Sequence, residues 1–324
     1  MLDYLASRPC ATSKGIQCGY PPTIAKAKDV CMSSPQAPRS PAAWTIRALM
    51  EWTERHFRDK AIESPRLEAQ LLLAHSLECR KTDLYTRWDE AVSEERRGRF
   101  RDLIKRRLEG CPVQYLLGYR DFFLLNLEVT PAVLIPRTET ELLVTEALNY
   151  LKPLSSPQVL DVGTGSGCIA IAIAHRHSTA KVTASDISGE ALEVARRNAD
   201  RHGVAEKIQF LQGDLLTPLN GERFDLIVSN PPYVSHAEFD ELAPQVRNFE
   251  PRLALDGGAD GYSIYDRLIP ESMHHLAPRG KLLLEIGHAQ EAGVRRRVEA
   301  AGLVADATIC DDQRHPRVIA ARKP

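Results

Sequence analysis

The apolar residues between positions 43 and 110 recur at helical spacing. Two stripes show this pattern: Ile46, Leu49, Met50, Thr53 and Phe57, and then Phe100, Leu103, Ile104 and Leu108. Between them, Ser64 and Pro65 are suited to the N-cap and first turn of another helix. The pattern predicts a small all-helical domain, which we place at residues 42–111.

Beyond residue 139 the pattern changes to short apolar runs separated by helical stretches such as Glu190–His202. Five runs are predicted as strands: Val159–Val162, Lys181–Ser185, Ile208–Gln212, Phe224–Val228 and Lys281–Ile286. This alternation is typical of a doubly wound α/β fold. Two later runs, Ala305–Cys310 and Arg317–Ala321, leave no room for a helix between them. They predict an antiparallel hairpin at the sheet edge, within a domain spanning residues 136–324.

Two further segments differ from both patterns. Residues 112–135 alternate apolar and polar positions around Gly118 and Asn126, which predicts a β-hairpin linker. Residues 1–41 contain six prolines and three cysteines without sustained periodicity, which predicts a disordered extension. Because basic residues outnumber acidic ones there, an organelle-targeting peptide is the alternative to a plain tail or an over-long start.

Composition narrows the class of protein. The 324 residues are 43% hydrophobic and 26% charged, and the net charge of −1 provides no global attraction for nucleic acid or anionic membrane. The basic run from Arg96 to Arg107 could meet an acidic or RNA-containing partner, or could be a solvated face with interleaved acids. The seven scattered cysteines argue against a metal site and for a reducing compartment. No stretch approaches the roughly 20 apolar residues of a membrane span. We expect a cytoplasmic protein, or a mitochondrial one if residues 1–41 are a leader.

The segment "VLDVGTGSGCIAIAIA" predicts a strand, a glycine-rich turn and a helix, the arrangement that lets backbone approach a nucleotide. The dinucleotide fingerprint requires a third glycine where this chain has Cys168. Alternate glycines after the acidic Asp161 are instead typical of S-adenosylmethionine sites. We therefore expect the loop to bind this cofactor through Gly163, Thr164, Gly165, Ser166 and Gly167.

Acidic residues end the next two predicted strands. Asp186 could accept both ribose hydroxyls of the cofactor, although it could also cap the helix that begins near Ser188. Asp214 and Leu215 could contact adenine, the carboxylate receiving the exocyclic amine and the leucine covering the ring. Taken alone, Asp214 would more often be a turn residue.

The fourth predicted strand ends in "SNPPYV", where two prolines remove two N–H donors. The loop can therefore offer only acceptors, the Asn230 side-chain oxygen and the Pro231 carbonyl. Two carbonyls could hold both hydrogens of a planar –NH2 group and orient its lone pair toward a sulfonium methyl. Tyr233 could stack on the amide or base that carries the nitrogen, with Pro232 stiffening the loop. The alternative is that the prolines only end a strand and Tyr233 packs in the core.

With these motifs the chain resembles the release factor glutamine methyltransferase family, also called HemK or PrmC, from about residue 43 to the end. The resemblance rests on "PVQYLLG", "VLIPRTETE", "DVGTGSG", "SNPPYV" and "EPRLALDGGADG". Thr138 stands where the family usually has proline, and residues 1–41 have no recognised counterpart.

The resemblance implies a seven-stranded class I S-adenosylmethionine-dependent methyltransferase domain behind a helical domain that docks a peptide chain release factor. It implies methyl transfer to the side-chain amide of the glutamine in the factor's Gly-Gly-Gln motif. Asn230, Pro231 and Tyr233 would be catalytic, Asn230 to Tyr233 would hold the glutamine, and Asn230 would also line the cofactor site. Arg137 to Glu141 would shape the rim between the domains.

Three other functions are consistent with parts of the pattern. An amino-methyltransferase of RNA or DNA bases could use the same loop, but residues 234–324 leave little room for a target-recognition domain. A nucleotide-binding oxidoreductase conflicts with Cys168 in place of the third glycine. A non-catalytic S-adenosylmethionine sensor would not require the Asn-Pro-Pro-Tyr sequence.

Overall fold

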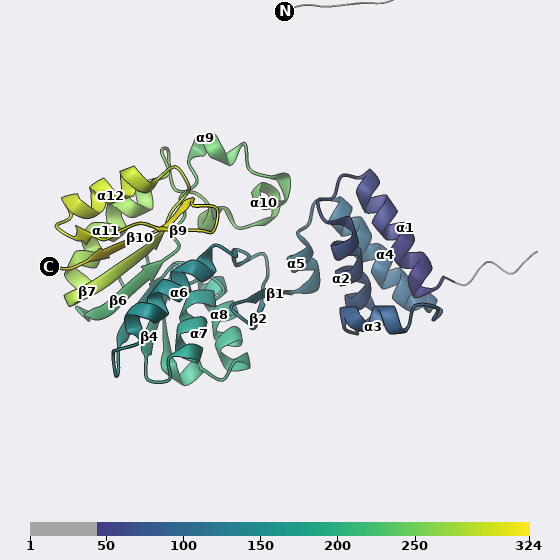
Figure 1. Ribbon diagram of the computed structural model, residues 1–324, viewed down its shortest axis with the longest axis horizontal. Helices are drawn as coiled ribbons and strands as arrows, with labels where there is room; N and C mark the ends of the chain where they lie inside the picture. The colour runs from purple at the N-terminus through teal and green to yellow at the C-terminus, as the bar shows by residue number, and fades with distance from the viewer. Residues whose placement is uncertain (1–43) are drawn as a thin grey trace, which may run out of the picture. The chain divides into compact units, whose positions relative to one another are not determined.

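A computed structural model describes residues 44–324 (Figure 1), so the predictions for residues 1–41 lie outside the described residues. The runs predicted as strands form one mixed sheet in the order β5-β4-β3-β6-β7-β10-β8, with β9 paired to β10. Its strands are β3 (Gln158–Val162), β4 (Lys181–Asp186), β5 (Ile208–Gln212), β6 (Phe224–Ser229), β7 (Leu276–Glu285), β8 (Val304–Ala305), β9 (Ile309–Cys310) and β10 (Pro316–Arg322). Strands β3 to β7 run parallel to one another, which confirms the doubly wound α/β fold.

The C-terminal segment differs in detail from the predicted edge hairpin. Strand β10 is antiparallel as expected, but it lies inside the sheet, between β7 and the short β8. Both β8 and β9 pair with β10, so two two-residue pieces share the last position of the sheet. The sheet thus has seven strand positions, although eight segments fill them.

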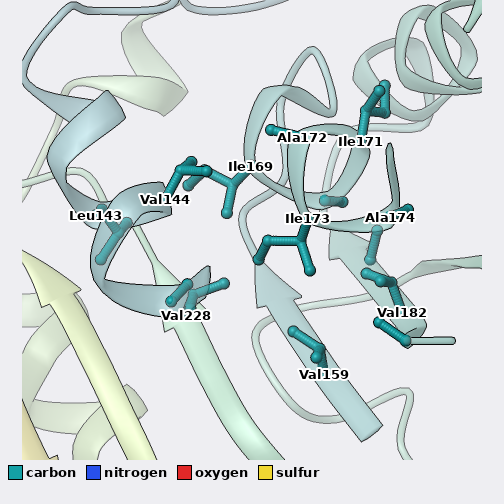
Figure 2. Close-up of a cluster of buried hydrophobic side chains, with 14 of the residues drawn as sticks. Leu143, Val144, Val159, Ile169, Ile171, Ala172, Ile173, Ala174, Val182 and Val228 are labelled. Carbon is teal, nitrogen blue, oxygen red and sulfur yellow. The ribbon is translucent and has the colours of Figure 1, made fainter. Parts of the chain in front are cut away.

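Helices cover both faces of the sheet (Figure 1). On one face lie α6 (Thr140–Leu151), α7 (Cys168–Arg176) and α8 (Gly189–Arg201), and on the other lie α11 (Ser263–His275) and α12 (Glu291–Ala300). A hydrophobic core lies on each face of the sheet, and successive strand residues point into opposite cores. Val228 faces the first set of helices and Ile227 the second. Figure 2 shows side chains of α6 and α7 gathered over Val159 and Val228.

The helical region consists of α1 (Ile46–Asp59), α2 (Pro65–Leu77), α3 (Lys81–Thr86) and α4 (Glu94–Leu108) around its own apolar core. Pro65 occupies the first turn of α2 as predicted, but the Ser64 side chain makes no capping hydrogen bond. Side-chain caps are found at two other helices, where the hydroxyl of Thr45 caps α1 and that of Ser93 caps α4.

The basic run on α4 divides into two parts. Arg97, Arg99 and Arg101 are paired with glutamates at the surface, which matches a solvated helix face. Arg107 does not belong to that face, because its side chain is only 8% exposed and forms a bidentate pair with Glu68 of α2. Its Nη2 also donates to Gln245 at 3.3 Å. Arg107 therefore uses its charge in a buried ion pair that joins α4 to α2.

The linker is a hairpin only in its middle part, residues 119–128. The apolar run after Pro112 forms a short helix, α5 (Val113–Leu117), which Gly118 ends with a left-handed φ of 79°. Strands β1 (Tyr119–Phe122) and β2 (Leu125–Glu128) follow, with the turn at Phe123 and Leu124 rather than at Asn126. The predicted hairpin was wrong for residues 113–117, which are helical, because five residues are too few for their pattern to distinguish a helical turn from a strand.

The stretch after β6 contains the short helices α9 (His236–Phe239) and α10 (Pro244–Phe249). Single 3-10 turns occur at Ala205–Lys207 and Arg252–Ala254. Among the helices of residues 44–324, none combines the length and apolar character required for a membrane crossing.

Candidate active site

Two loops emerge side by side from the carboxyl ends of β3 and β6. We call residues 163–167 the glycine loop and residues 230–233 the Asn-Pro-Pro-Tyr loop. The strands are paired in parallel up to Val162 and Ser229, so the loops begin from neighbouring positions. The chain order of the sheet reverses here, since β4 and β5 lie on one side of β3 and β6 on the other. In open α/β sheets, ligands bind at such a reversal.

The glycine loop depends on backbone conformations that side chains disfavour. Gly163, Gly165 and Gly167 have φ angles of 73°, 56° and 82°. A Cβ on Gly167 would lie 2.7 Å from Ile171, so this glycine allows close packing of loop and helix. A Cβ on Gly163 or Gly165 would meet no atom within 4 Å. These two glycines therefore border open space suited to a ligand.

Two buried polar atoms at this loop have no partner among the described residues. Asp161 is fully buried, and its Oδ2 accepts hydrogen bonds from Thr164 Oγ1 at 2.7 Å and Ala170 N at 3.1 Å. Its Oδ1 and the Ser166 hydroxyl are unpaired. Burial raises the pKa of Asp161 to about 7. An orphaned carboxylate oxygen would suit the amino group of a bound amino acid.

Asp186 is the last residue of β4, and its side chain contacts the glycine loop. Its Oδ2 accepts from Gly165 N at 2.8 Å, and its Oδ1 accepts from Ser188 N at 2.9 Å. Burial raises its pKa. The cap of helix α8 is the Ser188 hydroxyl, which accepts from Ala191 N. The carboxylate is thus held beside the glycine loop with lone pairs to spare, the arrangement that a ribose-binding role requires.

The third acidic strand end is more exposed. Asp214 forms an ion pair with Arg267, with its Oδ2 2.6 Å from Nη2, and both side chains are nearly half exposed. Leu215 has a left-handed φ of 50°, and its carbonyl accepts from Ser185 Oγ. An adenine role for these two residues stays a prediction. Ile187, which the sequence did not single out, is an apolar side chain left 49% exposed directly beside Asp186.

In the Asn-Pro-Pro-Tyr loop, the amide of Asn230 is anchored at its nitrogen. Asn230 Nδ2 donates to Thr140 Oγ1 at 3.1 Å. Its Oδ1 and the Pro231 carbonyl accept no hydrogen bond from residues 44–324. The loop therefore presents two acceptors as its sequence predicts.

Tyr233 rests on a glycine-rich support. Added Cβ atoms on Gly257 and Gly261 would lie 2.7 and 2.6 Å from Tyr233 backbone atoms. Gln290 Nε2 donates to the carbonyls of Tyr233 and Gly261, both at 3.1 Å. Burial raises the pKa of Tyr233 to about 12, so its hydroxyl is neutral at physiological pH. The glycines of "LDGGADG" thus allow the Asn-Pro-Pro-Tyr loop to lie against the backbone below it.

The segment Arg137 to Glu141 ties several elements together. Arg137 donates to Glu250 at 2.6 Å, and Glu250 also accepts from the backbone of Ile135. Glu141 accepts from Phe123 N and so holds the left-handed turn of the hairpin. Arg120 reaches Thr138, and Arg137, Thr138 and Glu250 line a cavity of about 280 Å³. That the whole segment shapes a rim stays a prediction, but Thr140 does not fit one because it is 1% exposed.

Sequence reasoning missed three residues that support the site. Asn198 is fully buried and bonds through Nδ2 to Ser166 O and Glu128 O, which ties the glycine loop to the hairpin. Thr140 anchors Asn230, and Glu285 lies buried at the end of β7. An acidic residue after the apolar run Leu282–Leu284 was the available signal, because burying a carboxyl is costly.

Comparison with known proteins identifies relatives along most of the chain. Residues 48–118 match the PrmC N-terminal domain family, and residues 138–246 match the methyltransferase small domain family. A release factor glutamine methyltransferase of Rhodopirellula baltica is 44% identical over 287 residues, covering 86% of this chain and 97% of that protein. One of Geobacter sulfurreducens is 40% identical over 282 residues, covering 87% and 98%.

A solved structure supports the fold independently. The hMettl16 catalytic domain, in complex with MAT2A 3'UTR hairpin 6, superposes with a TM-score of 0.51. The match covers 68% of this chain and 81% of that one at 15% identity, so it concerns the fold alone.

Proposed function

Because the chain belongs to the release factor glutamine methyltransferase family, we propose that it methylates the side-chain amide nitrogen of the glutamine in the Gly-Gly-Gln motif of peptide chain release factors. The observation that carries this proposal is the pair of unpaired acceptors in the Asn-Pro-Pro-Tyr loop, which lies beside the glycine loop. Asn230 Oδ1 and the Pro231 carbonyl are both free of partners in the described part of the chain, and a primary amide has two N–H donors to offer them.

The residues present fit S-adenosylmethionine as the methyl donor. The open space at Gly163 and Gly165 would receive its amino-acid portion, with Asp161 Oδ1 available to the amino group. Asp186 would accept the ribose hydroxyls, and Ile187 and Leu215 would flank the adenine ring. When bound, the cofactor supplies an electrophilic methyl on a sulfonium.

In the proposed mechanism the chain positions the nucleophile and stabilises charge. Asn230 Oδ1 and the Pro231 carbonyl accept one N–H each, so the amide nitrogen is fixed with its lone pair toward the methyl. The nitrogen gains positive charge as its bond to the methyl carbon forms and the carbon–sulfur bond breaks. The same carbonyls would stabilise that charge, and one N–H proton would then pass to solvent water to restore the neutral amide. Tyr233 would pack against the amide plane.

We assign docking of the release factor to the helical region, as the family resemblance implies. Four of the large apolar side chains left exposed occur there, namely Trp44, Trp52, Leu67 and Tyr85. A cavity of about 960 Å³ also lies among α2, α3 and α4. Exposed aromatic residues are typical of protein-binding surfaces. The cytoplasm stays the predicted compartment.

Methyl transfer with labelled S-adenosylmethionine tests the function. The purified protein should label a release factor and leave unlabelled the same factor with its motif glutamine replaced by alanine. Equal labelling of both factors would refute the glutamine assignment. Label found only on RNA or DNA would support the alternative, which the relatives do not favour.

A further inference from the structure

Asn198 is the one polar residue on the buried face of helix α8. The other buried residues of this helix are small or apolar: Ala191, Leu192, Val194, Ala195 and Ala199. The Asn198 side chain has no access to solvent, since the residue is 0% exposed. Burying an amide is costly unless its donors and acceptors find partners, so the contacts of Asn198 show what the residue does.

The Asn198 carboxamide is paired with the backbone of Glu128, the last residue of β2. Its Oδ1 accepts from Glu128 N at 2.7 Å, and its Nδ2 donates to Glu128 O at 3.0 Å. A flipped amide would place N–H against N–H and oxygen against oxygen. The backbone of the linker hairpin therefore fixes the orientation of the Asn198 amide.

This orientation directs the second N–H of Asn198 at the glycine loop. Nδ2 donates to the Ser166 carbonyl at 2.9 Å. The N–H of the same peptide group, which belongs to Gly167, donates to Thr164 O at 2.9 Å. Because a peptide group is planar, bonds to its carbonyl and to its N–H together fix the plane between Ser166 and Gly167.

The contact with Asn198 lies where the chain otherwise has wide conformational freedom. Gly165 and Gly167, on either side of Ser166, have left-handed φ angles of 56° and 82°. Glycine populates this region and the ordinary one about equally, so the glycines do not select the loop conformation by themselves. Gly165 N is bonded to Asp186, and Ser166 O to Asn198. Side chains from β4 and α8 thus hold two successive residues of the loop.

We propose that Asn198 is a positioning residue for S-adenosylmethionine: its carboxamide, oriented by Glu128, holds the Ser166 carbonyl and so keeps the glycine loop in its binding conformation before the cofactor arrives. This rests on the cofactor site of the proposed function and gives the linker hairpin a part in that site. A loop that is ordered in advance loses less conformational entropy on binding, which raises the affinity.

Two variants of Asn198 test the proposal. Asn198→Ala removes the carboxamide without adding charge, and Asn198→Asp keeps its shape but places a carboxylate oxygen against the two carbonyls. We expect each to weaken the binding of S-adenosylhomocysteine about tenfold in calorimetry. The KM for S-adenosylmethionine should rise in proportion, while kcat at saturating cofactor stays within about threefold. An affinity within twofold of the wild type in either folded variant would refute the proposal.

Val194→Ala is the matched control for a general loosening of helix α8. Val194 lies one helical turn before Asn198 and belongs to an apolar cluster with Val129 and Val133, which follow the hairpin. The variant should lower Tm, because it leaves a cavity at this contact, yet it should keep the affinity for S-adenosylhomocysteine within about twofold. If it weakened binding as much as Asn198→Ala does, a general structural role would explain both and the proposal would be wrong.

Hydrogen exchange in the cofactor-free protein separates this proposal from the proposed function. Asn198→Ala should speed exchange of the backbone amides of residues 163–167 about tenfold, and Val194→Ala should not. Equal exchange in the wild type and Asn198→Ala would refute the positioning role, whatever the protein methylates. A wild type that binds S-adenosylhomocysteine and shows these effects, but labels no release factor, would refute only the proposed function.

Discussion

The glycine loop and the Asn-Pro-Pro-Tyr loop leave neighbouring strands but are built on opposite principles. In the glycine loop, Gly163 and Gly165 border empty space, and nearby buried polar atoms lack partners. In the Asn-Pro-Pro-Tyr loop, prolines fix the backbone, and glycines lie beneath it rather than within it. Open space suits the cofactor-binding role proposed for the first loop, and rigidity suits the role proposed for the second, which is to orient one nitrogen. The comparison predicts that substitutions in the first loop change affinity and those in the second change rate.

The largest expected effect is at Asn230. Asn230→Ala should lower kcat by about 10²–10³, the usual loss when one preorganised polar contact to developing charge is removed. The affinity for S-adenosylhomocysteine should be little changed. Single-turnover rates and calorimetry measure the two quantities, and a rate loss below tenfold would show that the carbonyls do not hold the amide.

Next in size is a substitution beneath Tyr233. Gly257→Ala places a methyl 2.7 Å from the Tyr233 backbone, so it should move the Asn-Pro-Pro-Tyr loop and lower kcat about 10²-fold. Gly163→Ala is the matched control in the other loop. Its Cβ meets no protein atom, but its φ of 73° disfavours alanine, so backbone strain and the added methyl should together weaken cofactor binding. Both variants are measured for kcat and, by calorimetry, for cofactor affinity. If the same one of these two quantities changed in both variants, the two loops would not differ in role as proposed.

A smaller effect is expected at the cofactor carboxylate. Asp186→Ala should weaken binding of S-adenosylhomocysteine by about 10- to 100-fold, because a hydrogen bond to a charged group contributes about 1.5–3 kcal/mol. The rate at saturating cofactor should fall less than the affinity. If calorimetry showed an unchanged affinity, the role of Asp186 would be structural, through the hydrogen bonds that it accepts from Gly165 N and Ser188 N.

The smallest effect concerns stability and pH. The pKa of Glu285 is raised from 4.5 to about 7 by burial, so between these values the folded protein holds a proton that the unfolded chain has released. Stability therefore decreases as pH rises through this window. Glu285→Gln, which does not ionise, should raise Tm by about 3 °C relative to the wild type at pH 8 and leave it unchanged at pH 4. Thermal unfolding at the two pH values measures this, and an equal change at both would exclude titration of Glu285 as the cause.

The fold was predictable where local pattern and tertiary environment agree. Parallel strands buried on both faces read as continuous apolar runs, which is why Phe224–Val228 and Val159–Val162 were placed within one residue of the observed β6 and β3. Strand β7 was predicted from Lys281 but begins at Leu276, in a stretch without a continuous apolar run. The apolar pattern did not predict the helix at Val113–Leu117, because this segment is too short to show a helical period. It failed also at Arg107, whose partner Glu68 lies on another helix and has no local signature.

The candidate site was predictable to a similar extent. Glycine and proline carry their conformational consequences in their own covalent structure, so both loops could be recognised from the sequence. Supporting residues carry no such mark: Thr140 reads as one polar residue among several until folding brings it to Asn230. Of the supporting residues, only Glu285 has a signal in the sequence, because a carboxyl directly after three leucines is costly to bury.

The proposed grip by two carbonyl oxygens also has a consequence for damaged substrates. Spontaneous deamidation would convert the motif glutamine to glutamate, which has the same length but only lone pairs to present. Asn230 Oδ1 and the Pro231 carbonyl would then face a carboxylate without an intervening hydrogen, and the contact would be repulsive. A deamidated factor would thus be excluded twice, because it lacks the nitrogen that receives the methyl group and because its carboxylate is repelled by the two carbonyls.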